Sequence, residues 1–256
     1  PPMKKWLLLI ALASLASRAN VLSFADARCP RDVATYFQVF PEELLETTVG
    51  GEKPTLDVPF ANQFLIQRLS AWENSFIAAG DVIMKYHLNP LCVGLYNDGA
   101  SPNAKAAGED VVIFGVNLTL ELQRGMNLPG EKALTSVLAH EYGHTIQNRH
   151  GLVFDYTLPM LSTKIKELQA DCMAGMLLNL HREYDLSDVA MGERLMVVLG
   201  DIHPVGDHGM GNERRLAFMR GLNAATLLMN SGKRVLSVTS GDLVKACGAF
   251  YRPTKK

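Results

Sequence analysis

Apolar residues recur at helical spacing over most of the chain, and only two short runs have the pattern of a strand. The clearest repeat lies between residues 60 and 87, where aromatic and aliphatic side chains fall every three or four positions. This stripe predicts one long amphipathic core helix. Further helices are expected after residue 129, over residues 131–149, 161–184, 187–199, 213–230 and 241–250.

Two apolar runs, residues 91–96 and 111–116, predict short strands. The stretch between them, residues 97–108, is rich in glycine, asparagine and proline and is expected to form a long loop. The second strand is expected at an edge of the sheet, where an extended peptide could pair with it. These elements together predict a mainly helical α+β fold in which a small sheet precedes most of the helices.

The overall composition is that of a globular protein. The chain has 256 residues, of which 48% are hydrophobic and 20% are charged, and this argues against disorder. Its formal net charge of −1 argues against nucleic-acid binding, which normally goes with a basic excess. No apolar run reaches the ~20 residues that a bilayer requires, so no stable membrane span is expected in the mature chain.

The first 19 residues are expected to be removed rather than folded. Two prolines before the first methionine look like a cloning scar. Two lysines, an apolar run over residues 6–16 and small residues near Ala19 then follow the layout of a secretory signal peptide, with cleavage at residues 17–19 or 25–27. A retained N-terminal anchor helix is the alternative. We therefore expect one domain over residues 20–256, periplasmic or secreted by a bacterium.

Export would change the meaning of the four cysteines, which are Cys29, Cys92, Cys172 and Cys247. None of them forms a CxxC pair, so a cysteine zinc site is not expected. In an oxidising compartment they could form up to two disulfides, and the sequence does not determine the pairing. Four buried thiols are an equally open alternative.

Residues 140–144 read His-Glu-Tyr-Gly-His, an HExxH pattern inside the helix expected over residues 131–149. Residues four apart lie on one helical face, so His140 and His144 can bind one zinc ion together. Glu141 would lie beside the metal, where it can take a proton from a zinc-activated water. So short a pattern also arises by chance, and the alternative is two surface histidines and a solvated acid.

Two carboxylates in the next expected helix could complete the zinc site. Two histidines leave a catalytic zinc ion one protein ligand short, and Glu167 can supply the third. Asp171, one turn later, can accept the outer N–H of a ligand histidine and so fix its tautomer. Gly143 is explained if a backbone or a substrate passes close to the HExxH helix. Arg214 could pair with Asp171, or could be an ordinary surface arginine.

The motifs HEYGH, ELQADCMAG, and HG followed by NERR resemble those of the neutral zinc metallopeptidases of bacteria, part of the gluzincin group that includes thermolysin-like enzymes. The matching segments are residues 140–147, 167–175 and 208–221, and residues 20–60 are hardly covered. Relatives often carry a third adjacent histidine where this chain has Thr145. The resemblance implies a zincin-like fold with a small sheet beside the HExxH helix. It also implies zinc on His140, His144 and Glu167, Glu141 as general base, and Asp171 as the partner of His140.

Peptide hydrolysis also needs a donor that stabilises the oxyanion. His203 and His208 are candidates, and His208 is favoured because it matches the HG segment of the resembling family. Tyr142 is expected to pack, and His87, His150 and His181 to lie at the surface. The sequence thus predicts an exported zinc metalloendopeptidase acting on peptides or unfolded proteins. The alternative is a zinc-containing binding or chaperone-like module with little or no turnover.

Overall fold

The computed structural model describes the larger part of the chain from residue 58 onward. The described residues are 58–86, 92–96, 98, 102–107, 111–125, 130–152, 159–182, 186–200 and 208–248. The expected signal peptide, both cleavage sites, Cys29, His87 and His203 lie outside them. Among the described residues, no helix combines the length and the apolar character that crossing a membrane would require.

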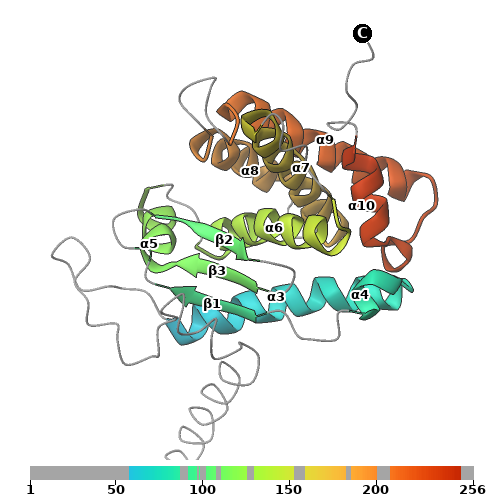
Figure 1. The fold of residues 1–256 in the computed structure, drawn as a ribbon, viewed down its shortest axis with the longest axis horizontal. Coiled ribbons are helices and arrows are strands. Elements are labelled where there is room, and N and C mark those ends of the chain that lie inside the picture. The colour runs from blue at the N-terminus through green and yellow to red at the C-terminus, as the bar shows by residue number, and fades with distance from the viewer. Residues whose placement is uncertain are drawn as a thin grey trace, which may run out of the picture.

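The described chain is mostly helical and has one small mixed sheet, consistent with the predicted α+β class. Figure 1 shows the sheet and α3 on one side of α6, and α7 to α10 on the other. The elements are α3 (Val58–Ala78), α4 (Val82–Tyr86), β1 (Cys92–Tyr96), β2 (Ala104–Ala107), β3 (Val111–Gly115), α5 (Val116–Gly125), α6 (Gly130–Arg149), α7 (Pro159–Leu180), α8 (Leu186–Val198), α9 (Gly211–Asn230), a 3₁₀ turn (Val235–Ser237) and α10 (Ser240–Cys247).

The sheet has three strands among the described residues, in the order β1-β3-β2. β3 pairs in parallel with β1 and antiparallel with β2. β3 is therefore the central strand, and the expectation that residues 111–116 form an edge is wrong. All five residues of β3 are buried, as in a strand covered on both faces. Among the described strands, β1 and the short β2 form the two edges, and Lys105 of β2 is exposed.

β2 and α5 were not expected. β2 falls within the stretch expected to be a loop, and it is held there by Asp98. The carboxylate of Asp98 accepts hydrogen bonds from the backbone N–H of Asn103 just before β2, at 3.2 Å. It also accepts from the N–H groups of Asn117 and Leu118 in the first turn of α5, both at 2.9 Å. One carboxylate therefore fixes the start of the edge strand and caps α5.

The helix expected over residues 60–87 is interrupted. α3 ends at Ala78, Gly80 adopts a left-handed conformation with φ +78°, and Asp81 caps the start of α4. One oxygen of Asp81 accepts from the N–H groups of Ile83 and Met84, at 3.1 and 3.2 Å. The other accepts from the N–H and the hydroxyl of Ser240, at 2.6 and 2.5 Å. Asp81 thus joins the α3–α4 corner to the first residue of α10.

α6 is the central helix of the described structure. Every residue from 134 to 147 is buried, so α6 is covered on all sides rather than along one stripe. Figure 1 shows α6 between the sheet with α3 and the group of C-terminal helices. The HExxH residues are therefore part of the protein core, which excludes the alternative of two surface histidines.

α7 and α9 pack closely at two glycines. A Cβ on Gly175 would collide with the carbonyl oxygen of Phe218, and one on Gly221 would collide with that of Cys172. A disulfide between Cys172 and Cys247 joins α7 to α10. Cys92 is also disulfide-bonded, so no described cysteine is a free thiol. The sequence left disulfides and thiols equally open, and the structure favours disulfides.

Candidate metal centre

Three potential metal ligands converge between α6 and α7. His140 and His144 lie one turn apart on α6, with their Nε2 atoms 3.1 Å apart. Glu167 reaches them from α7, with carboxylate oxygens 3.1 Å from Nε2 of His140 and 3.3 Å from Nε2 of His144. One ligand atom from each residue lies within 4.8 Å of the others. This buried group could hold a metal ion.

Gly143 allows the two helices to approach closely enough for this convergence. A Cβ at residue 143 would lie 3.1 Å from both Cα and the carbonyl oxygen of Ala170 in α7, tighter than ordinary contact. Ala170 lies three residues after Glu167, so the close approach is adjacent to the third ligand. The expectation that another backbone passes near Gly143 is confirmed.

A buried ion pair, Asp171 with Arg214, lies next to the Nδ1 atom of His140. Nδ1 of His140 is 2.8 Å from Oδ1 of Asp171, a residue with no exposed surface. Arg214 from α9 donates to both oxygens of Asp171, through Nε and Nη2, each at 2.8 Å. A third donor of Arg214, Nη1, binds the carbonyl oxygen of Leu199 at 2.8 Å. Arg214 therefore holds Asp171 against the imidazole, and its pairing with Asp171, left open by the sequence, is present.

The Nδ1 atom of His144 contacts a neutral side chain, Gln147, which was not predicted from the sequence. Nδ1 of His144 is 2.8 Å from Oε1 of Gln147, which is completely buried. Gln147 is three residues after His144 on the same helix, a spacing at which side chains meet. That spacing was the available signal, although glutamine at such a position is usually solvated.

The ionisable groups of the cluster shift one another's pKa values in favour of the charged forms. Burial disfavours a charged imidazole, but the carboxylate of Asp171 outweighs burial and raises the pKa of His140 to about 10. Burial likewise opposes ionisation of Glu167, but the two imidazoles hold the pKa of its carboxyl well below its usual range. For Asp171, the neighbouring Arg214 outweighs burial and lowers the pKa. Both carboxyl groups are therefore ionised at neutral pH.

The cluster opens into a cleft of about 490 Å³. One wall is formed by the edge strand β2 and the residues just before it, 102–106, and another by α6 and α7. Glu141 lines this cleft without belonging to the ligand group. His208 is exposed and lines the same cleft, so the structure brings it together with the HExxH residues.

Tyr142 and the two other described histidines, His150 and His181, lie outside the lining of this cleft. Tyr142 is fully buried and stacks on Trp72 with 5.8 Å between ring centroids, which confirms its packing role. His150 and His181 are half-buried rather than simply at the surface. Nε2 of His150 lies 2.8 Å from the Ser240 hydroxyl, and the His181 ring lies 6.2 Å from that of Trp72.

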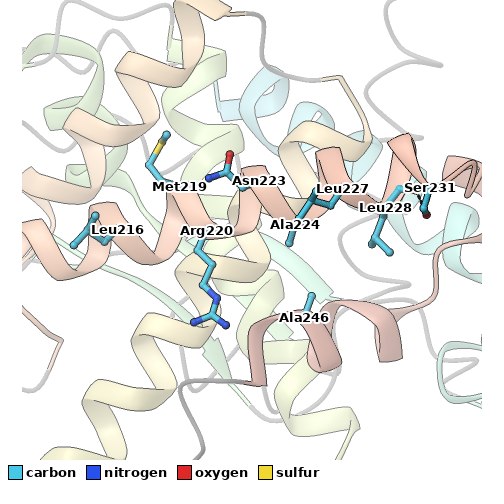
Figure 2. A pocket seen from close by; sticks show the side chains of 9 residues that line it. All are labelled: Leu216, Met219, Arg220, Asn223, Ala224, Leu227, Leu228, Ser231 and Ala246. Carbon is cyan, nitrogen blue, oxygen red and sulfur yellow. Dashed lines mark hydrogen bonds between the residues drawn. The ribbon is translucent and has the colours of Figure 1, made fainter.

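A larger groove of about 710 Å³ lies over α9 and α10. Figure 2 shows that its lining comes from one face of α9, including Leu216 and Leu227, together with Ala246 of α10. No histidine, cysteine, aspartate or glutamate is among the described residues that line it. The described lining of the groove therefore offers none of the ligands that zinc uses, and the smaller cleft is the candidate site.

No protein-family model, no curated protein and no solved structure matches this chain. The residues of the cleft therefore provide the basis for proposing a function.

Proposed function

We propose that this protein is a zinc-dependent metallopeptidase with a zincin-like fold, related to the neutral zinc metallopeptidases that its motifs resemble. The main support is the convergence of His140, His144 and Glu167 beside a cleft that Glu141 also lines. Among the described residues, no fourth side chain joins the three. Structural zinc sites normally have four protein ligands, whereas catalytic sites have three and leave a position for water or substrate.

The residues present fit zinc. Two imidazole nitrogens and one carboxylate are a ligand set that catalytic zinc sites use. Each imidazole also has a hydrogen-bond partner at its other nitrogen, as metal-binding histidines almost always do. When bound, zinc would lower the pKa of an attacking water and polarise the substrate carbonyl.

Glu141 would act as general base and then as general acid. It would accept the proton of the attacking water and deliver it to the leaving amine. Its carboxylate is suited to this role because it follows His140 directly and lines the cleft without joining the ligand group. The neighbouring imidazoles hold the pKa of Glu167 well below its usual range, so Glu167 would serve as ligand rather than as base.

The substrate would bind as an extended peptide along β2. Among the strands that the structure describes, β2 pairs with β3 alone, and residues 102–106 line the cleft. An edge strand offers unpaired backbone groups with which a peptide can form a further strand. His208, exposed at the same cleft, would donate to the oxyanion that develops on the attacked carbonyl.

We also propose that the protein is exported. The disulfide between Cys172 and Cys247 supports this, because disulfides persist mainly in oxidising compartments. The signal peptide predicted over residues 1–19 would direct the chain there.

The test is Glu141→Gln, which keeps the shape and the three ligands but removes the proton acceptor. Hydrolysis of an unfolded protein should fall by about 10²–10⁴-fold while zinc content is unchanged. Glu131→Gln is the matched control, because Glu131 is exposed in the first turn of the same helix. Equal turnover in Glu141→Gln and parent would overturn the mechanism. Bound zinc without turnover in the parent would instead favour a zinc-containing binding or chaperone-like module.

A further inference from the structure

The Nδ1 atoms of the two histidines in the cluster contact different side chains. His140 faces the ionised carboxylate of Asp171, whereas His144 faces the neutral amide of Gln147, in both cases at 2.8 Å. Gln147 also binds two groups of α7 through its Nε2 atom. These are the carbonyl oxygen of Lys166 and Oε1 of Gln169, both at 2.9 Å.

These contacts determine which way the amide of Gln147 points. A backbone carbonyl can only accept a hydrogen bond, so the NH₂ group of Gln147 must face Lys166. Its Oε1 atom must then face His144, and an amide oxygen can only accept. Nδ1 of His144 therefore carries a hydrogen, and a metal ion could bind this ring only through Nε2, the nitrogen that faces Glu167 and the cleft.

The same amide also connects the ring to the backbone that carries the third ligand. The Lys166 carbonyl belongs to the residue just before Glu167, and Gln169 lies two residues after it. Gln147 is fully buried and Gln169 is 1% exposed, so water does not compete for these contacts. A change at residue 147 would therefore disturb both the orientation of His144 and its distance from Glu167.

We infer that Gln147 is a positioning residue for the metal site: its amide fixes the tautomer and orientation of His144 and sets the distance between His144 and Glu167. This inference rests on the metal site of the proposed function. The competing explanation is that Gln147 only fastens α6 to α7, as many buried amides do, and has no particular effect on the metal.

Two variants at residue 147 separate these explanations. Gln147→Met removes all three hydrogen bonds at nearly constant size. Gln147→Glu keeps an acceptor for Nδ1–H of His144 but loses the donors to Lys166 and Gln169. If Gln147 positions the metal ligand, zinc affinity should fall by about 10–100-fold in Gln147→Met and by clearly less in Gln147→Glu. If it only fastens the helices, the buried charge of Gln147→Glu should make that variant the worse of the two.

The measurements are zinc competition against a chelator and proton NMR of the zinc-loaded protein with ¹⁵N-labelled histidine. The parent should show protected Nδ1–H signals from both His140 and His144. Gln147→Met should lose only the signal of His144, and Gln147→Glu should keep it. Gln67→Met, on an exposed position of α3, is the control for the chemical change and should match the parent.

Unchanged zinc affinity and an intact His144 signal in Gln147→Met would overturn the inference, and so would a larger loss of zinc in Gln147→Glu. Neither result depends on peptide hydrolysis, so the proposed enzyme could still stand. Turnover that is insensitive to Glu141→Gln would overturn the proposed mechanism and leave Gln147 in its role. A parent that binds no zinc would overturn both.

Discussion

Asp171 contacts a potential metal ligand and a buried cation with the same carboxylate. One oxygen faces His140 and both accept from Arg214, whose side chain is only 4% exposed. Removing the charge of Asp171 would therefore weaken the imidazole as a ligand and leave a guanidinium buried without its counter-ion.

Asp171→Asn should accordingly reduce both zinc retention and stability. We expect about 10–100-fold weaker zinc binding by chelator competition. The free energy of unfolding of the metal-free protein, measured in urea, should fall by about 3–5 kcal/mol. Glu193→Gln is the control, because its partner Arg215 is 38% exposed and such pairs contribute at most about 1 kcal/mol. Similar losses in the two variants would contradict the role of Asp171.

His181 should make the fold sensitive to acid. Burial disfavours its charged form and lowers its pKa from 6.5 to about 4. Between these pH values the unfolded chain binds a proton that the folded protein does not, so stability falls as the pH decreases through this range. The loss should be at most about 3 kcal/mol relative to His181→Gln, as measured by urea unfolding across the range. Parallel pH dependence in the two proteins would show that His181 is not responsible.

Among the elements, the crossing of α7 and α9 should tolerate substitution least. In Gly221→Ala the new methyl group would collide with the backbone of Cys172, which cannot move independently of α7. We expect a loss of about 3 kcal/mol or more in the free energy of unfolding. Gly241→Ala is the control, because its Cβ would meet only ordinary contacts in the first turn of α10. That change should be neutral or stabilise by up to about 1 kcal/mol.

The sequence predicted the long helices well and the short elements poorly. α6 was expected to within one residue, because its apolar repeat is long and Gly151 follows it. β2 was missed because its Ala-Lys-Ala-Ala sequence lacks the β-branched and aromatic residues that indicate strands. The break at Gly80 was missed because the apolar repeat continues into α4. In these cases tertiary contacts, such as those of Asp98 and Asp81, decide the local structure.

The sequence predicted those parts of the candidate site that depend on the spacing of residues along one helix. His140 and His144 follow helical spacing, and the position of Glu167 follows from the need for a third ligand. The contacts of Arg214 with Asp171, and of Gln147 with α7, connect residues on different helices. No spacing rule relates such residues, so the contacts that hold Asp171 and Gln147 in place required the structure, although Asp171 itself was predicted as the partner of His140.

At the scale of the whole molecule, the disulfide between Cys172 and Cys247 closes a loop of 75 residues that contains α8 and α9. In the chain-entropy description, such a loop contributes about 4 kcal/mol by restricting the unfolded chain. Replacing both cysteines by alanine should lower the free energy of unfolding in urea by about 2–5 kcal/mol. An unchanged unfolding midpoint would mean that the unfolded chain is not restricted by this bond.

The double role of Asp81 has a consequence for how the folded protein opens locally. The N–H groups of Met84 and Ser240 donate to the same carboxylate although the chain positions of Asp81 and Ser240 are 159 residues apart. If the Asp81 carboxylate moves away, the first turns of α4 and α10 should lose their hydrogen bonds at the same time. Native-state hydrogen exchange should therefore give the two amides the same opening free energy and the same response to denaturant. Different values would show that the two helix starts open separately, and equal values would make them one cooperative unit.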